Sequence, residues 1–271
     1  MNQFKGITII SDMDGTLLND QKKISAQNRE AIAYFIKNGG NFSIASGRIF
    51  SRLWMYREKI QVTLPVITMN GMMIQDFSTG SVLYSEQLDA SAKEYTKTIF
   101  EKHPYLGLEI YTDDTVHFIH RNRHIDKHIS DEGFHLNICS LEEVQGEWRK
   151  VLFGCDENLL ETIEQEFPYM KEKVHFTKSD AYFYEILAKG ANKGSALRHL
   201  AQQTGIDLSR VIAVGDNIND LEFIKAAGAG TAVANAGEAV KECSRFVLHQ
   251  NNNQAPMQEL IGKLENGEFV I

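Results

Sequence analysis

The sequence predicts an α/β protein whose parallel-sheet core is interrupted by an inserted α+β region. Uninterrupted apolar runs that end in Asp, Ser or Gly occur near both ends of the chain, with helix-like segments between them. Buried parallel strands are typically continuous apolar runs, because helices cover both faces of the sheet. The middle of the chain has strand-like segments at hairpin spacing, which is typical of a separate α+β region.

The first core elements follow from apolar patterning near the N-terminus. Residues 6–11 (GITIIS) are apolar and largely β-branched, which predicts a buried strand. Apolar residues recur at helical spacing over 27–37, and Ser25 is positioned to cap this helix. Further strands are expected over 41–46 and 65–69. This strand, helix, strand order predicts parallel pairing.

The same order of elements returns in the last third of the chain. Strands are expected over 210–214 and 229–233, and helices over 192–204, 217–227, 239–243 and 258–264. Because the pattern repeats the one at the N-terminus, we expect both stretches to build one Rossmann-like sheet.

The middle of the chain is expected to fold as an inserted α+β domain. Residues 107–120 predict two strands around an Asp-Asp turn; further strands are expected over 149–154 and 181–187, and helices over 89–102 and 156–167. Hairpin strands with helices on one face indicate a small domain of their own. The predicted boundaries are 83–186 for the insertion, and 1–82 with 187–271 for the core.

Composition excludes several classes of protein. The 271 residues are 43% hydrophobic and 24% charged, and the formal net charge is −8. An acidic chain without a basic block predicts no nucleic-acid partner and no anionic membrane surface. The three cysteines are far apart and form no CxxC, so neither a zinc ribbon nor a disulfide framework is expected. The acidic first twenty residues and the lack of a long apolar stretch predict a cytoplasmic protein.

Two carboxylates directly follow the first strand. Asp12 and Asp14 flank Met13, and residues two apart in an extended chain point the same way. We therefore expect both carboxylates at the carboxyl end of the strand, where open α/β sheets place their sites. A magnesium ion would remove their repulsion, because it prefers hard oxygen ligands. The alternative is a solvated acidic turn.

Three further segments have suitable chemistry at the ends of predicted elements. Ser46 and Gly47 end the second strand and offer a hydroxyl and amides to a phosphate oxygen. Lys193 lies at the start of a helix, where a cation is unfavourable unless it neutralises a nearby anion. The segment GDNIND at 215–220 ends another strand. Taken singly, these could be a helix cap, a surface lysine and a capping turn.

Together these segments resemble the four motifs of the haloacid-dehalogenase-like superfamily. The chain is most similar to its Cof-like, large-cap branch. The matching segments are DMDGTLL (12–18), IASGR (44–48), ITMNGM (67–72), KGANKG (189–194) and GDNINDLEF (215–223). The resemblance covers essentially the whole chain. It implies an inserted cap that closes over the site, and a phosphatase that acts on a small-molecule phosphate ester, such as a sugar phosphate or phosphorylated cofactor.

The resemblance also implies roles for the matching residues. Asp12 would be the nucleophile that forms an aspartyl phosphate, and Asp14 the acid and then the base. Asp12, the backbone carbonyl of Asp14, and Asp216 would hold Mg²⁺. The phosphate would be bound by Ser46, Lys193, Asn219 and the amides of Met13 and Gly47. Asp220 would support Lys193 or a metal-bound water.

Substrate contacts are less defined by the motifs. Arg48 and Asn70 lie on core loops near the expected site, and Tyr182, Tyr184 and Glu185 lie near the return from the insertion. Each could touch the substrate, and the tyrosines and Glu185 could equally be structural strand residues.

Two departures from the family pattern leave alternatives open. Ser46 stands where threonine is commoner, although the hydroxyl remains. Residues 249–254 (HQNNNQ) lack the carboxylates and glycine that the family often has there. This change is the reason to keep a catalytically weak phospho-ligand-binding or sensory protein as an alternative. A sugar-phosphate mutase is a third possibility.

A histidine repeat in the insertion suggests a second type of site. His120, His124 and His128 recur every four residues, and a single helix would put them on one face, as in some zinc sites. No cysteine or paired glutamate completes such a site, and basic residues crowd the segment. We therefore expect a solvated helix here.

Overall fold

The computed structural model describes residues 2–156, 162–163, 165–269 and 271. The chain divides into two compact units, which we call the core unit (Met1–Tyr84 and Asn192–Ile271) and the inserted unit (Ser85–Ala191). The inserted unit extends past residue 186, because its last strand, β10 (Phe183–Ala188), stays paired with β9 up to Ala188. In the described part of the chain, no helix is long and apolar enough to cross a bilayer.

The core unit is built on a five-stranded parallel sheet. Its strands lie in the order β13-β12-β11-β1-β2. Their bounds are β1 Thr8–Ser11, β2 Asn41–Ile44, β11 Val211–Gly215, β12 Ala229–Ala232 and β13 Phe246–Val247. Because all five strands run the same way, their carboxyl ends meet at one edge of the sheet.

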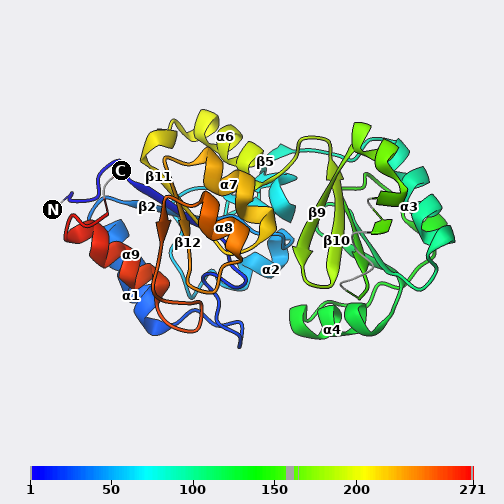
Figure 1. The fold of residues 1–271 in the computed structure, drawn as a ribbon, viewed down its shortest axis with the longest axis horizontal. Helices are drawn as coiled ribbons and strands as arrows, with labels where there is room; N and C mark the ends of the chain where they lie inside the picture. The colour runs from blue at the N-terminus through cyan, green and yellow to red at the C-terminus, as the bar shows by residue number, and fades with distance from the viewer. Residues whose placement is uncertain (1, 157–161, 164, 270) are drawn as a thin grey trace. The chain divides into compact units, whose positions relative to one another are not determined.

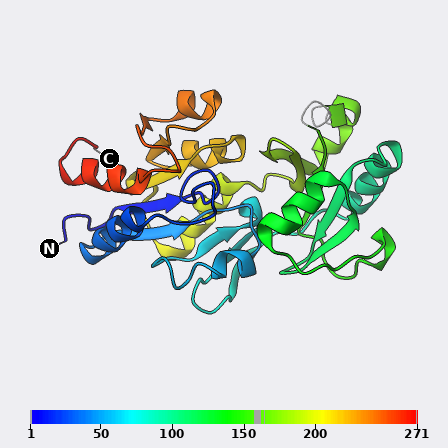
Figure 2. The same cartoon turned by 90° about the horizontal axis from the view of Figure 1, so that it is seen from below.

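Helices cover both faces of this sheet (Figures 1 and 2). Ile9 of β1 packs into the apolar cluster that includes α1 and α9, and Ile10 packs into the cluster of α6 and α7. Adjacent strand residues point to opposite faces, so both are fully buried. The helices of the core unit are α1 Ala26–Lys37, α2 Phe50–Trp54, α6 Lys193–Thr204, α7 Leu221–Ala226, α8 Glu238–Cys243 and α9 Pro256–Glu265. Its 3-10 turns are η1 Met69–Gly71, η4 Leu208–Arg210 and η5 Ile218–Asp220.

A small second sheet in the core unit was not foreseen from the sequence. Strands β3 (Val66–Thr68), β4 (Met73–Gln75) and β5 (Val82–Ser85) form a three-stranded sheet, and η1 joins β3 to β4 in an antiparallel hairpin. The predicted strand over 65–69 is its first member. These strands are too short for a period-two pattern to be recognised.

The inserted unit contains a five-stranded antiparallel sheet in the order β7-β6-β8-β10-β9. Besides β10, its elements are α3 Ser91–Lys102, β6 Gly107–Tyr111, β7 Val116–His120, α4 Arg123–Glu132, η2 Leu141–Glu143, β8 Lys150–Gly154, η3 Pro168–Glu172 and β9 Val174–Asp180. Leu108 and Ile110 point into the apolar cluster, and Glu109 points to the opposite face. The helix expected over 156–167 lies mostly outside the described residues. The predicted α/β class with an inserted α+β unit is confirmed.

The expected helix through all three histidines of the repeat is wrong. His120 ends β7 and its Nδ1 lies 2.7 Å from the carbonyl of Leu106, while α4 begins only at Arg123. His124 and His128 are on α4, but their side chains are only 12% and 17% exposed, so they are not solvated. The chain turns from strand to helix within the repeat because Asn122 caps α4.

Candidate active site

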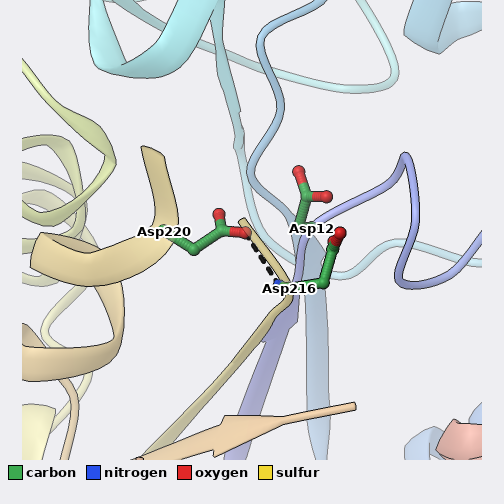
Figure 3. A group of neighbouring side chains, drawn as sticks. All are labelled: Asp12, Asp216 and Asp220. Carbon is green, nitrogen blue, oxygen red and sulfur yellow. Dashed lines mark hydrogen bonds between the residues drawn. The ribbon is translucent and has the colours of Figure 1, made fainter. Parts of the chain in front are cut away.

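Three carboxylates converge at the carboxyl edge of the core sheet (Figure 3). Ser11 pairs with Val214, so Asp12 after β1 and Asp216 after β11 emerge side by side. Asp220 comes from η5, and its Oδ2 accepts a hydrogen bond from the amide of Asp216 at 3.0 Å. One oxygen from each of the three side chains lies within 4.8 Å of the other two, which is a spacing that one cation could bridge.

Lys193 is completely buried beside these carboxylates. Its Nζ donates to Asp12 Oδ1 and to Asp220 Oδ1, each at 2.6 Å. A capping box between Asn192 and Ser195 fixes the start of α6, so the first residue of the helix points into the site. Gly194 permits this approach, because a Cβ there would lie 2.2 Å from the carbonyl oxygen of Glu222. The alternative of a surface lysine is therefore wrong.

The charges in this cluster are unbalanced. Burial raises the pKa of Asp12 well above 3.8, and Asp220 and Asp216 raise it further against the opposing effect of Lys193. Burial, and then Asp220, raise the pKa of Asp216 to about 7. Burial alone would lower the pKa of Lys193, but Asp12 and Asp220 raise it above 10.5, so this ammonium stays charged. Three carboxylates share one ammonium, and a divalent cation would neutralise the remaining negative charge.

The turn after β1 is shaped by Asp216. Gly15 has φ +76°, and a Cβ at this position would lie 2.4 Å from Asp216 Oδ2. The hydroxyl of Thr16 donates to Asp216 Oδ1 at 2.5 Å. Glycine and threonine in DMDGT thus let the turn close against the neighbouring strand's carboxylate, and the hydroxyl of Thr16 is a contact that sequence reasoning missed.

Asp14 does not join the three-carboxylate cluster. Arg48 donates to both of its oxygens, from Nε at 2.6 Å and from Nη2 at 2.8 Å, and Lys22 Nζ lies 2.5 Å from Oδ1. Burial would raise the pKa of Asp14, but Arg48 and then Lys22 lower it well below 3.8. The strand on which the expected common direction of Asp12 and Asp14 rested ends at Ser11, before either residue. No sequence signal marked Lys22.

Ser46 follows β2 and is 1% exposed. Its hydroxyl oxygen accepts a hydrogen bond from the amide of Arg48 at 3.2 Å. The next helix, α2, begins at Phe50 with Ile49 at its N-cap, so Ser46 does not cap that helix. Its buried position at the carboxyl edge, together with the amide of Gly47, is compatible with the expected phosphate-binding role.

The segment GDNIND both caps a turn and contributes to the site. Asn217 and Asp220 form the capping box of η5, so the capping alternative is right for these two side chains. Asp216 and Asn219 take no part in that box. Asn219 instead donates from Nδ2 to Oδ1 of Asn70 at 3.0 Å.

The loop at 249–254 holds the turn that follows Asp14. Asn252 donates from Nδ2 to the carbonyl of Leu18 at 3.2 Å and to Asp20 Oδ1 at 3.0 Å. Asn253 donates to Asp20 Oδ2 at 2.9 Å. Asn235, outside this loop, accepts a hydrogen bond from the amide of Asn252 at 2.9 Å and donates to the carbonyl of Gly15 at 2.7 Å. Asparagine in place of acidic residues therefore suits this loop, because Asp20 is already a carboxylate. The contacts to Leu18 and Gly15 link residues more than 200 positions apart.

The residues expected to contact substrate from the insertion are held within the inserted unit. Tyr184 is 4% exposed and stacks on Phe176 with ring centroids 5.4 Å apart. Glu185 is 2% exposed and its Oε1 lies 3.1 Å from Lys150 Nζ. Tyr182 is 44% exposed and stacks on His124.

The site combines carboxylates and a buried lysine at the carboxyl edge of a parallel sheet. This combination of fold and site is typical of enzymes that transfer phosphoryl groups. A family model described as haloacid dehalogenase-like hydrolase matches residues 9–260. The chain belongs to this family.

Individual relatives match over nearly their whole length. The Bacillus subtilis protein YxeH is 31% identical over 254 residues, covering 90% of this chain and 93% of its own. The 5-amino-6-(5-phospho-D-ribitylamino)uracil phosphatase YcsE of the same organism is 30% identical over 244 residues, covering 90% of each chain. Among solved structures, TM0651 from Thermotoga maritima has a TM-score of 0.79 and 27% identity, covering 95% of this chain and 97% of its own. The protein is accordingly a phosphatase of the haloacid dehalogenase-like family.

Proposed function

We propose that the protein hydrolyses small phosphorylated metabolites in a magnesium-dependent reaction, through an aspartyl phosphate on Asp12. The observation that carries this proposal is the bridge from Lys193 to Asp12 and Asp220, at 2.6 Å each. It places a permanent cation against the expected nucleophile, where charge develops as a phosphoryl group is transferred.

The residues present fit a magnesium ion. The three-carboxylate cluster offers hard oxygen ligands within 4.8 Å of one another, and burial, with the repulsion between the carboxylates, raises the pKa of Asp12 and Asp216. Asp12, Asp216 and the backbone carbonyl of Asp14 would hold the ion. When bound, it would keep both carboxylates ionised at neutral pH and stabilise negative charge on the phosphoryl oxygens.

In the first half-reaction, a carboxylate oxygen of Asp12 attacks phosphorus and the bond from phosphorus to the ester oxygen breaks. Lys193, the hydroxyl of Ser46 and the amide of Asn219 bind the phosphoryl oxygens, and protonated Asp14 gives its proton to the leaving oxygen. In the second, Asp14 takes a proton from water. The resulting hydroxide attacks phosphorus, and the bond to Asp12 breaks to release phosphate and the free carboxylate.

Asp14 must change its surroundings to donate that proton. Its pairing with Arg48 and Lys22 lowers its pKa, which favours the ionised form. We expect these pairs to loosen when a substrate phosphate competes for the two cations. We therefore expect Arg48 to lie near the substrate phosphate.

The substrate class is a small phosphate ester. One of the relatives acts on a phosphorylated ribitylaminouracil. The acidic charge of −8 offers no surface for nucleic acid. We propose that the inserted unit is the cap and that its residues select the leaving group, as is usual for insertions that exclude water from a site.

A phosphate-release panel tests the proposed function. Purified protein is assayed against sugar phosphates, nucleotides and phosphorylated cofactors, once with Mg²⁺ and once with chelator. We expect release of inorganic phosphate from at least one ester, and loss of that release with chelator. Isomerised phosphate ester in place of free phosphate would indicate a mutase, and ligand binding with no release would indicate a sensory protein.

A further inference from the structure

The turn between β3 and β4 has an unfavourable backbone. Met69 and Asn70 both have left-handed conformations, with φ 49° and 56°, and Gly71 follows with φ 100°. Asparagine tolerates this region better than most residues, whereas methionine does not. Both side chains are buried, at 0% and 1% exposure. Such a conformation persists only where the surroundings hold it, and it often marks a functional site.

The surroundings that hold this turn are the other loops of the site. The amide of Met69 donates to the carbonyl of Arg48, and the amide of Asn70 donates to the carbonyl of Ser46, each at 3.0 Å. Gly71 packs against the residue before Lys193, since a Cβ there would lie 2.2 Å from the carbonyl oxygen of Asn192. The turn therefore connects the Ser46 loop with the start of α6.

The side chain of Asn70 connects the turn to a third loop. Its Oδ1 accepts the hydrogen bond from Asn219 Nδ2 at 3.0 Å. Its carboxamide also lies against Gly47, where a Cβ would be 3.0 Å from Nδ2 and 3.1 Å from Oδ1 of Asn70. The buried amide of Asn70 thus touches both Gly47 and Asn219, two residues expected to bind phosphate.

This contact selects one orientation of the Asn219 amide. The two ends of a carboxamide have nearly the same shape, but only the nitrogen can donate a hydrogen bond to Oδ1 of Asn70. The nitrogen carries two hydrogens, so one is used by Asn70 and the other is available to a phosphate oxygen. The opposite end, Asn219 Oδ1, is buried and has no hydrogen-bond partner among the described residues. The oxygen end of the Asn219 amide therefore does not fix the orientation of the group, and the hydrogen bond to Asn70 does.

We propose that Asn70 is a positioning residue that holds Asn219 with its NH₂ group toward the transferred phosphate. Without Asn70, the Asn219 amide is free to reverse, and its oxygen would then face the anion. In this proposal Asn70 acts through Asn219 rather than as the substrate contact that the sequence suggested. The inference rests on the proposed function, because the phosphate-binding role of Asn219 belongs to it.

A double-mutant cycle tests the proposal. The variants are Asn70→Gly, Asn219→Ala and the two combined, and each is measured by kcat/KM and by competitive inhibition with inorganic phosphate. Glycine adopts the left-handed backbone freely, so Asn70→Gly removes the amide without straining the turn. We expect each single variant to weaken phosphate inhibition and lower kcat/KM by about 10- to 100-fold, the range for losing a hydrogen bond to a charged group. The double variant should be no worse than Asn219→Ala alone.

The chain offers a matched control. Asn2 also has a left-handed backbone, with φ 113°, and lies beside Gly39 outside the site. Asn2→Gly should leave phosphate inhibition and kcat/KM within about twofold of the wild type, since surface changes away from special contacts have small effects. Losses that multiply in the double variant would overturn the role of Asn70. A wild-type protein that neither releases phosphate nor is inhibited by it would instead overturn the proposed function.

Discussion

The core unit and the inserted unit both bury charged side chains, but they balance them differently. In the inserted unit, Glu109 and Glu185 each lie beside a basic side chain: Glu109 Oε1 lies 3.0 Å from His128 Nδ1, and Glu185 Oε1 lies 3.1 Å from Lys150 Nζ. In the core unit the three-carboxylate cluster has one ammonium bound to it among the described residues, that of Lys193, which contacts Asp12 and Asp220. Paired charges hold a structure in one arrangement, whereas an unpaired excess of negative charge creates a place for a cation.

The largest expected effect concerns the core carboxylate that is the proposed nucleophile. Asp12→Asn should reduce turnover by about a thousandfold or more, because an amide cannot attack phosphorus, and losses of this size are usual for nucleophiles. Steady-state phosphate release measures it. Asp207→Asn makes the same chemical change in the core unit before the N-terminal end of β11, at the edge of the sheet opposite the site, and should leave turnover nearly unchanged. Equal activity of the two variants would contradict the role of Asp12.

Breaking a balanced pair in the inserted unit should mainly affect stability. Lys150→Met leaves Glu185 as a buried carboxylate without this cation, which should cost about 3–5 kcal/mol of unfolding free energy. Denaturant unfolding, with hydrogen exchange of the β8 and β10 amides, measures the loss. The double variant Lys150→Met, Glu185→Met should recover most of it, since an apolar pair replaces a charged one. A loss below about 1 kcal/mol for the single variant would show that the pair is not structurally important.

Removing a carboxylate from the core cluster should increase the unfolding free energy, whereas breaking the pair in the inserted unit decreases it. The pKa of Asp216 rises from 3.8 to about 7 on folding, so the folded state holds a proton that the unfolded state releases in this interval. Metal-free protein should therefore lose stability as the pH rises from 3.8 to about 7. Asp216→Asn should reduce this slope, of which Asp12 contributes the rest because its pKa is also raised above 3.8, and should stabilise the metal-free protein by on the order of 2 kcal/mol near neutral pH.

Magnesium provides the control for that prediction. Thermal unfolding with Mg²⁺ should raise the Tm of the wild type more than that of the Asp216→Asn variant, because the ion relieves the repulsion that the variant lacks. A variant that is less stable than the metal-free wild type at neutral pH would contradict the idea of an unbalanced cluster.

The smallest expected effect is on stability, and it comes from the titration of His128, which pairs with Glu109 in the inserted unit. Burial lowers the pKa of His128, but Glu109 and then Glu132 outweigh burial and the repulsion of Lys150, so the pKa is raised above 6.5. The stabilising contribution is complete below pH 6.5 and should be lost as the pH rises through the higher folded pKa. We expect the unfolding free energy to change by less than about 1 kcal/mol as the pH rises from 6.5 through the folded pKa of His128. Denaturant unfolding over this pH range measures the change.

His128→Gln should flatten this pH dependence, because glutamine can still donate to Glu109 but does not titrate. Substituting the exposed His135 in the same way provides the control and should leave the slope unchanged. An undiminished slope in His128→Gln would assign the pH dependence to another group.

Local patterns were enough to predict the parts of the site that lie at the ends of core elements. Asp12, Lys193 and Asp216 each directly follow or begin an element whose apolar run is plain in the sequence. The order of those elements predicted the parallel sheet, and parallel strands bring their carboxyl ends to one edge. Proximity of these three residues therefore followed from topology.

Contacts between distant side chains were not predictable in this way. Arg48 pairs with Asp14 across 34 positions, and Asn219 reaches Asn70 across 149. The hairpin that carries Asn70 has three-residue strands, too short to show a pattern. The histidine repeat had helical spacing, yet a strand ends inside it because Asn122 starts a new helix.

The sequence by itself determined the order of elements and the chemical types of residue at their ends, since apolar periodicity and capping act over a few residues. Only the tertiary structure decided which charges are shared and which are balanced. That outcome depends on the packing of loops from distant parts of the chain, such as the loop that brings Arg48 to Asp14, and this packing leaves no mark in any local pattern.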